Sequence, residues 1–210
     1  IIILSVEPQQ ANGVLEEISE YIDDDKHSLL ISVVSSLSID EIKKVINKDI
    51  EVVRAMPNIA ITIGESITCL ASEPTGSENF QTANDIFSTV GETLVIEEEQ
   101  MAGATSLSGC GIAFFLRAIR AASQGGIEIG FDSEDALKIA SQTAKGAASL
   151  LVKSGNHPES EIDKVTTPRG CTIVGLNQME HDGFSSAMIK GIKVSSDKAE
   201  GLYDADVNND

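Results

Sequence analysis

The residues best suited to chemistry lie in one short loop, residues 166–172, whose sequence is TTPRGCT. Hydroxyl groups and unhindered main-chain amides of this loop come just before a predicted helix, and Arg169 adds a positive charge to an otherwise acidic chain. The amides and the dipole at a helix N-terminus favour the binding of a carboxylate or a phosphate. An ordinary capped loop would carry the same features, so the residues alone weigh an anion site and a simple loop equally.

A second candidate position follows a strand predicted over residues 51–56. Met56, Pro57 and Asn58 form either a plain turn or the border of a ligand site. Ligands of α/β sheets bind at the carboxyl ends of the strands, and this rule shifts the balance towards a ligand site.

Residues 109–114, GCGIAF, invite comparison with a dinucleotide-binding fingerprint but do not fit it. Phe114 stands where the fingerprint requires Gly or Ala, and no strand leads directly into the segment. The N-terminus of a helix that contains glycine is therefore the favoured interpretation. No other glycine fingerprint and no P-loop occurs, so these residues contain no phosphate cradle for a nucleotide.

Metal and nucleophile chemistry have less support. The histidines His27, His157 and His181 stand far apart, so no metal site is predicted. Cys171 could act as a nucleophile, but the sequence places no histidine beside it, and a small residue that fills a tight loop is the favoured interpretation.

The composition excludes several kinds of partner. Thirty-three Asp and Glu residues against 15 Lys and Arg residues give a formal net charge of −18, which argues against nucleic acid and against anionic membrane surfaces. A hydrophobic content of 41% supports a proper core, and the scarcity of aromatic residues makes that core aliphatic. Three cysteines without a C-x-x-C spacing indicate a reducing compartment, so we expect a cytoplasmic protein.

Two expectations concern the ends and the surroundings of the chain. No apolar run approaches the ~20 residues that a membrane span needs, so no span is predicted. The chain opens at Ile1 in an apolar run typical of a buried strand, and we expect it to begin part-way into a larger fold.

The first half of the chain alternates between two patterns. Apolar runs predict strands over residues 1–6, 29–34, 51–56, 66–71 and 93–96. Helical spacing lies between them, and Ser38 with Glu41 forms a capping box at the start of one helix. Strands that alternate with short helices predict an α/β layer with a largely parallel sheet.

Beyond residues 97–99 every pattern is helical. The predicted helices are one through residues 112–119 that stops at Gly125-Gly126, a long one between an Asp132 cap and Gly155, a short one after Pro158, one over residues 173–181 and one over residues 184–202. Their faces are rich in Ala and Gly and make only a thin core. Burial against a second copy of the chain would cover them, so we interpret this half as a dimerisation domain.

Four blocks carry a resemblance to a known family. They are ILSVEPQ at residues 3–9, VRAMPN at 53–58, TSLSGCG at 105–111 and DKVTTPRGCTI at 163–173, the last followed by GL at 175–176 and ME at 179–180. With His157-Pro158 placed before the last block, the chain resembles pyrroline-5-carboxylate reductase, the last enzyme of proline biosynthesis, over nearly its whole length.

The resemblance implies an α/β partial Rossmann-like nucleotide-binding domain followed by an all-α dimerisation domain. Residues 1–97 would be the C-terminal part of the NAD(P)-binding domain, residues 98–203 a helical dimerisation and substrate-binding domain, and residues 204–210 an acidic tail. The glycine fingerprint and its flanking elements would lie upstream of Ile1. The implied reaction is the reduction of 1-pyrroline-5-carboxylate to L-proline with NADPH or NADH, in a homodimer or higher homo-oligomer.

The same resemblance implies roles for single residues. The substrate carboxylate would bind the Thr167 hydroxyl and the amides near Gly170, Cys171 and Thr172, and the catalytic Thr172 would also reach the ring nitrogen. The nicotinamide ribose would border seven residues, namely Ser5, Val6, Glu7, Pro8, Met56, Pro57 and Asn58.

Some alternatives stay open at this stage. Family members usually carry Lys at the position of Glu7, which leaves the choice between NADPH and NADH open. They usually carry Gly at the position of Arg169, and this arginine could strengthen or obstruct carboxylate binding. A truncated, non-catalytic dimeric module of the same family is the alternative function. A hydroxy-acid dehydrogenase would need a Lys or His acid/base after the nucleotide domain, and no His occurs between residues 93 and 156.

Overall fold

The structure is a computed structural model that describes residues 1–24 and 27–201. The chain forms two compact units, which are described one after the other. The first contains Ile1–Ile112 and the chain from Ile192 onward, and the second contains Ala113–Gly191.

The first unit is built on a five-stranded sheet. Its strands lie side by side in chain order: β1 (Ile2–Leu4), β2 (Leu29–Ser32), β3 (Glu51–Met56), β4 (Ser66–Ser72) and β5 (Gly91–Val95). Three of the four pairings are parallel, as predicted, and β3 with β4 is antiparallel. The connection between those two strands, residues 57–65, is shorter than the dozen or so residues that a parallel crossover needs, so the chain must turn back.

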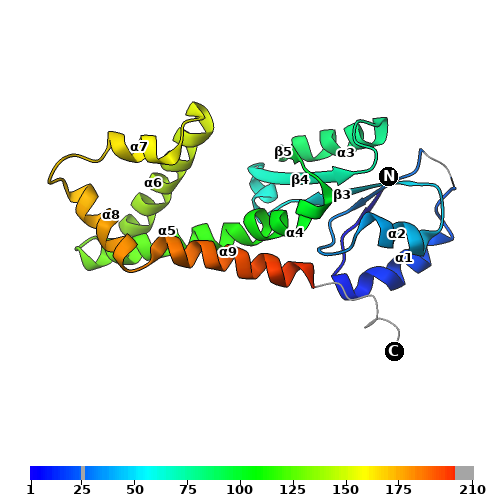
Figure 1. The fold of residues 1–210 in the computed structure, drawn as a ribbon, viewed down its shortest axis with the longest axis horizontal. Coiled ribbons are helices and arrows are strands. Elements are labelled where there is room, and N and C mark those ends of the chain that lie inside the picture. The colour runs from blue at the N-terminus through cyan, green and yellow to red at the C-terminus, as the bar shows by residue number, and fades with distance from the viewer. Residues whose placement is uncertain (25–26, 202–210) are drawn as a thin grey trace. The chain divides into compact units, whose positions relative to one another are not determined.

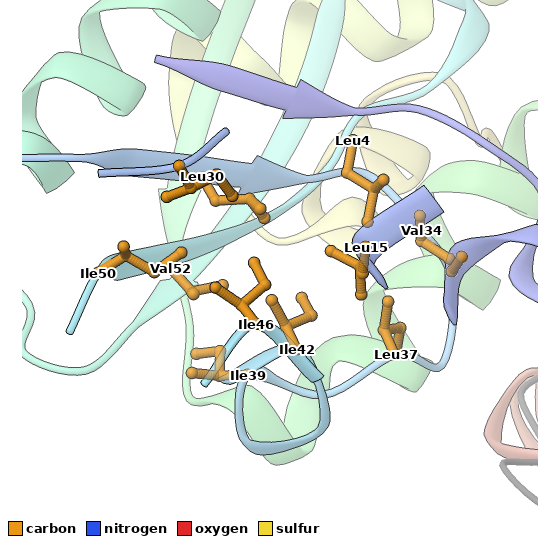
Figure 2. Close-up of a cluster of buried hydrophobic side chains, with 12 residues drawn as sticks. Leu4, Leu15, Leu30, Val34, Leu37, Ile39, Ile42, Ile46, Ile50 and Val52 are labelled. Atoms are coloured by element: carbon orange, nitrogen blue, oxygen red, sulfur yellow. The ribbon is translucent and has the colours of Figure 1, made fainter. Parts of the chain in front are cut away.

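Helices cover both faces of this sheet (Figure 1). On one face, α1 (Ala11–Ser19) and α2 (Ile39–Ile46) enclose an aliphatic cluster that includes Leu15, Leu30 and Ile42 (Figure 2). On the other face, α3 (Glu78–Ser88) packs Phe80 and Phe87 against the sheet. Successive strand residues point to opposite faces, so β2 and β3 supply side chains to both clusters.

The predicted capping box of α2 is confirmed. The Ser38 hydroxyl accepts a hydrogen bond from the Glu41 amide at 3.2 Å, and the Glu41 carboxylate accepts one from the Ser38 amide at 2.8 Å. The helix ends at Asn47, which adopts the left-handed conformation with φ 50°.

One continuous helical segment, Glu98–Glu128, follows the sheet. It comprises η3 (Glu98–Gln100), α4 (Met101–Ala104), the π-helix η4 (Thr105–Cys110) and α5 (Gly111–Glu128). The predicted helix start at residues 109–111 agrees with the first residue of α5, Gly111, but the helical segment as a whole begins earlier, at Glu98, and passes through these glycines. By length and composition alone, this segment is also long and apolar enough to cross a membrane, contrary to the expectation from the sequence.

The predicted end of this helix at Gly125-Gly126 is wrong, because α5 continues to Glu128 and packs closely against the next helix at Gly126. A Cβ atom placed on Gly126 would lie 3.1 Å from the Cβ atom of Ala136, so the glycine allows α5 to approach the next helix closely. A glycine inside a helix costs about 1 kcal/mol relative to Ala, which tertiary contacts readily offset. The helix ends instead near Gly130, whose φ is 109°.

The second unit is all helical. After α5 come α6 (Ser133–Ser154), α7 (Pro158–Lys164), α8 (Cys171–His181) and the first part of α9 (Phe184–Glu200). Asp132 caps α6 as predicted, because its carboxylate accepts hydrogen bonds from the amides of Glu134 and Asp135 at 3.0 and 2.9 Å. Gly155 closes that helix with φ 65°.

The last two predicted helices differ from the observed ones only at their ends. The predicted helix over residues 173–181 begins two residues earlier, at Cys171, and the last helix ends at Glu200. The predicted end at residue 202 and the acidic tail lie outside the described residues.

Candidate functional site

Two of the predicted segments lie at the same edge of the sheet in the first unit. Ser5, Val6, Glu7 and Pro8 follow the carboxyl end of β1, Met56 is the last residue of β3, and Pro57 and Asn58 follow it. Strands β1, β2 and β3 are parallel, so both segments emerge at the same edge. This is the edge at which open α/β sheets bind ligands.

The loop after β1 is short and ordered by local hydrogen bonds. Pro8 opens the 3₁₀-helix η1 (Pro8–Gln10), and the Glu7 amide donates a hydrogen bond to the Gln10 side chain at 3.4 Å. Ser5 and Glu7 are exposed, whereas Val6 and Pro8 are half-buried. The exposed Glu7 carboxylate therefore adds a negative charge at the edge where the coenzyme is expected.

The turn after β3 is held through Asn58. Its main-chain amide donates to the Ser66 hydroxyl at 3.2 Å, and its side-chain oxygen accepts from the Ala60 amide at 3.0 Å, which begins the 3₁₀-helix η2 (Ile59–Ile63). The side-chain nitrogen donates to the Ser108 hydroxyl at 3.3 Å. The main-chain amide, the side-chain oxygen and the side-chain nitrogen of Asn58 all make hydrogen bonds, so the turn has a defined conformation.

Sequence reasoning missed Ser108 and the π-helix that carries it. Thr105, Ser106 and Ser108 of η4 are all buried, and a Cβ atom on Gly109 would lie 3.9 Å from the Met56 sulfur. The π-helix therefore packs directly against the turn after β3. The block TSLSGCG was a usable signal, because three hydroxyl residues fall within four positions of an otherwise apolar and glycine-rich stretch.

An ion pair lies on the same sheet, and its arginine comes two residues before the predicted turn segment begins at Met56. The Arg54 guanidinium, whose side chain is 7% exposed, donates to the Glu98 carboxylate at 3.1 Å. Glu98 also accepts the Ile39 amide at the start of α2 at 2.8 Å. Burial lowers the pKa of Arg54, and the nearby carboxylates of Glu98 and Glu41 oppose that effect. The signal in the sequence was an arginine inside an apolar strand, since a buried charge requires a partner.

The predicted anion loop lies in the second unit. Thr166 closes α7 by donating its hydroxyl hydrogen bond to the Ile162 carbonyl at 2.8 Å, and the Gly170 amide donates to the Thr167 carbonyl at 2.9 Å. Arg169 adopts φ 60°, a left-handed conformation that glycine adopts most easily. The loop thus forms a tight turn immediately before α8.

Gly170 has no room for a side chain. A Cβ atom there would lie 2.6 Å from the Thr167 hydroxyl oxygen and 3.0 Å from its carbonyl oxygen. Gly170 is the residue that precedes α8, and no side chain caps that helix. The Thr167 hydroxyl therefore lies beside the N-terminus of α8, where the first helical amides belong to Cys171 and Thr172.

This arrangement suits a carboxylate. The first amides of a helix lack partners within the helix, and its dipole favours negative charge there. Among the hydrogen bonds of the described residues, none engages the Thr167 hydroxyl.

The three cysteines are free thiols; Cys171 is exposed, and burial raises the pKa of the Cys69 thiol. In residues 1–24 and 27–201, no group of three or more His, Cys, Asp or Glu side chains is placed to hold a metal ion.

The two sets of predicted site residues belong to different units. The seven predicted coenzyme residues lie in the first unit, and the four predicted substrate residues lie in the second.

The second unit also contains an apolar groove of about 820 Å³ between α5 and α6. It is lined by small and aliphatic residues that include Ile119, Ile139 and Ala140. Ala136, Ala140, Thr143 and Ala147 of α6 all line this groove.

Comparison with known proteins gives one consistent result. Residues 98–202 match the family described as pyrroline-5-carboxylate reductase dimerisation. Pyrroline-5-carboxylate reductase 1 of Dictyostelium discoideum is 53% identical over 97% of this chain and 39% of its own length. Pyrroline-5-carboxylate reductase 2 of the same organism is 47% identical over 95% of this chain and 71% of its own length.

A solved structure agrees with these relatives. Pyrroline carboxylate reductase of Plasmodium falciparum, with NADP bound, matches with a TM-score of 0.89 at 28% identity, over 97% of this chain and 82% of that one. The fold is therefore a partial Rossmann-like α/β domain followed by a helical dimerisation segment. The chain belongs to the pyrroline-5-carboxylate reductase family.

Proposed function

We propose that the protein containing this chain reduces 1-pyrroline-5-carboxylate to L-proline with NADPH or NADH. The observation that carries the proposal is the uncapped start of α8, with the Thr167 hydroxyl packed against Gly170. A cyclic imine that bears a carboxylate is the substrate class that such an anion site fits. The NADP bound to the Plasmodium falciparum relative supports the coenzyme class.

Each segment has a defined part in the proposed mechanism. Thr167 and the amides of Cys171 and Thr172 bind the substrate carboxylate and thereby fix the orientation of the ring. The Thr172 hydroxyl donates a hydrogen bond at the ring nitrogen, which favours hydride addition at the neighbouring carbon. The bound nicotinamide coenzyme supplies that hydride. Orientation of two reactants is a large part of catalysis in such a reaction, since the cofactor carries the redox chemistry.

The residues at the sheet edge fit the nicotinamide end of a dinucleotide. The loops after β1 and β3 are polar, partly exposed and adjacent to the carboxyl ends of parallel strands. We propose that the phosphate end of the coenzyme is bound by residues upstream of this chain. The chain has no glycine fingerprint, and it spans only 39% and 71% of the lengths of the two Dictyostelium discoideum reductases. Ile1, which precedes the edge strand β1, and Ile3 within that strand are exposed by 72% and 51%, and both would pack against those upstream residues.

The test of chemistry is oxidation of NADPH or NADH in the presence of pyrroline-5-carboxylate. We expect a protein extended upstream to turn over and this chain alone to bind coenzyme too weakly to measure. Turnover by this chain alone would contradict the proposed upstream phosphate site. An extended protein that shows no turnover would contradict the reductase function and favour a non-catalytic dimeric module.

Thr172→Ala tests the assigned catalytic residue in the extended protein. We expect kcat/KM for the imine to fall about 100-fold, because a hydrogen bond made to the reacting group is lost. Thr172→Ser keeps the hydroxyl and is the matched control, which we expect to retain most of the activity. An unchanged kcat/KM in the alanine variant would rule out the role of this hydroxyl.

We also propose a homodimer or higher homo-oligomer located in the cytoplasm. The match of residues 98–202 to the dimerisation family and the apolar groove between α5 and α6 support the oligomer. The free thiols support a reducing compartment.

A further inference from the structure

The π-helix η4 directs two buried hydroxyl groups towards different partners. Ser108 donates a hydrogen bond to the Ile67 carbonyl of β4 at 3.1 Å and accepts one from the Asn58 side chain at 3.3 Å. Ser106, two residues earlier, donates to the Ile192 carbonyl of α9 at 2.5 Å. The same helical turn therefore connects one hydroxyl to the turn after β3 and the other to the last helix.

The chain of hydrogen bonds fixes the orientation of Asn58. Its side-chain oxygen is occupied by the Ala60 amide, so its side-chain nitrogen must face Ser108. Ser108 in turn has its hydrogen occupied by the Ile67 carbonyl and offers a lone pair to Asn58. Ser108 is 8% exposed, so water has little access to replace either bond.

The position of Ser108 depends on the π-helix. A π-helix bonds residue i to i+5 rather than i+4, so one extra residue is accommodated in the turn. In a regular α-helix from Met101, side chains beyond Cys110 would be rotated by one residue, or about 100°, and those inside the present π-helix by part of that angle. Ser108 would then be turned from its present direction towards β4 and Asn58. Insertions of this kind recur at functional sites in proteins.

We propose that Ser108 is a positioning residue that holds Asn58, and with it the turn of Met56 and Pro57, in the conformation that receives the nicotinamide end of the coenzyme. This inference rests on the proposed reductase function. Ser108 touches Asn58 and the Ile67 carbonyl, so it acts through the turn and needs no contact with the reacting atoms.

The test compares two serines of the same π-helix in the full-length protein. Ser108→Ala leaves the Asn58 nitrogen without its partner, and we expect the coenzyme KM to rise about tenfold, as for one lost buried hydrogen bond. The imine KM should stay within about twofold, because the carboxylate loop is separate. Ser106→Ala is the matched control, since it removes an equally buried hydroxyl that bonds α9 instead of the turn.

A conservative variant separates positioning from folding. Ser108→Thr retains the hydroxyl, and we expect it to restore the coenzyme KM to within about threefold of wild type. An unchanged coenzyme KM in Ser108→Ala would overturn the inference, and so would an equal rise of the coenzyme KM in Ser106→Ala. In both cases turnover by the wild-type protein would still support the reductase function. If Ser108→Ala does not fold, a Thr variant that folds but shows the raised coenzyme KM would overturn it too. A wild-type protein without coenzyme-dependent turnover would overturn the inference and the proposed function together.

Discussion

At the scale of single residues, the anion loop shows how one missing side chain can shape a site. Gly170 has an ordinary φ of −73°, so its role is not conformational freedom. A Cβ atom would occupy the space of the Thr167 hydroxyl, 2.6 Å away. The glycine is therefore required because a hydroxyl and the first amides of α8 must lie close together.

Gly170→Ala should displace the Thr167 hydroxyl and raise the imine KM about tenfold, without changing the coenzyme KM. Steady-state kinetics of the full-length protein measure both constants. Gly175→Ala, in the same helix but with open space around it, should leave both unchanged. Equal effects of the two alanines would show that helix α8, and not the hydroxyl, determines binding.

At the scale of elements, Glu98 joins three of them. It belongs to η3, it pairs with Arg54 of β3 and it accepts the first amide of α2 from Ile39. A carboxylate at a helix N-terminus is favoured by the helix dipole, and the buried guanidinium needs a counter-charge. The beginning of the segment that matches the dimerisation family is thus anchored to the sheet by charge.

Glu98→Gln should lower the free energy of unfolding by about 2 kcal/mol, because Arg54 would remain buried without a counter-charge. Urea denaturation followed by circular dichroism measures the loss. The neighbouring Glu99 is exposed, so Glu99→Gln should change stability by less than about 0.5 kcal/mol. If both variants are equally stable, the ion pair contributes nothing to the fold.

At the scale of the whole molecule, the second unit leaves much apolar surface uncovered. Phe115, Leu137 and Ile139 are exposed by 60%, 50% and 49%. Contiguous apolar surface of this kind marks an interaction site in a folded protein. The match of this region to a dimerisation family supports the proposal that a second copy of the chain covers that surface.

Ile139→Glu should therefore convert the proposed dimer into a monomer, because a carboxylate would be buried in the α5–α6 groove. Light scattering after size exclusion measures the mass. Lys138→Glu is the control: it is the adjacent exposed residue and adds more negative charge, yet it does not line the groove and should remain dimeric. A dimer in both variants would place the interface elsewhere.

Features that depend on neighbouring residues could be predicted from the sequence. The bounds of β3, the Ser38–Glu41 capping box, the Asp132 cap of α6 and a tight loop before α8 all follow from local propensity and local hydrogen bonds. Three features could be read only from the folded chain: the passage of α5 through Gly125 and Gly126, the π-helix beside Asn58 and the partner of Arg54. These depend on contacts between residues distant in the chain, such as Arg54 with Glu98, and such contacts outweigh local preference because burial makes an unpaired charge or hydroxyl costly.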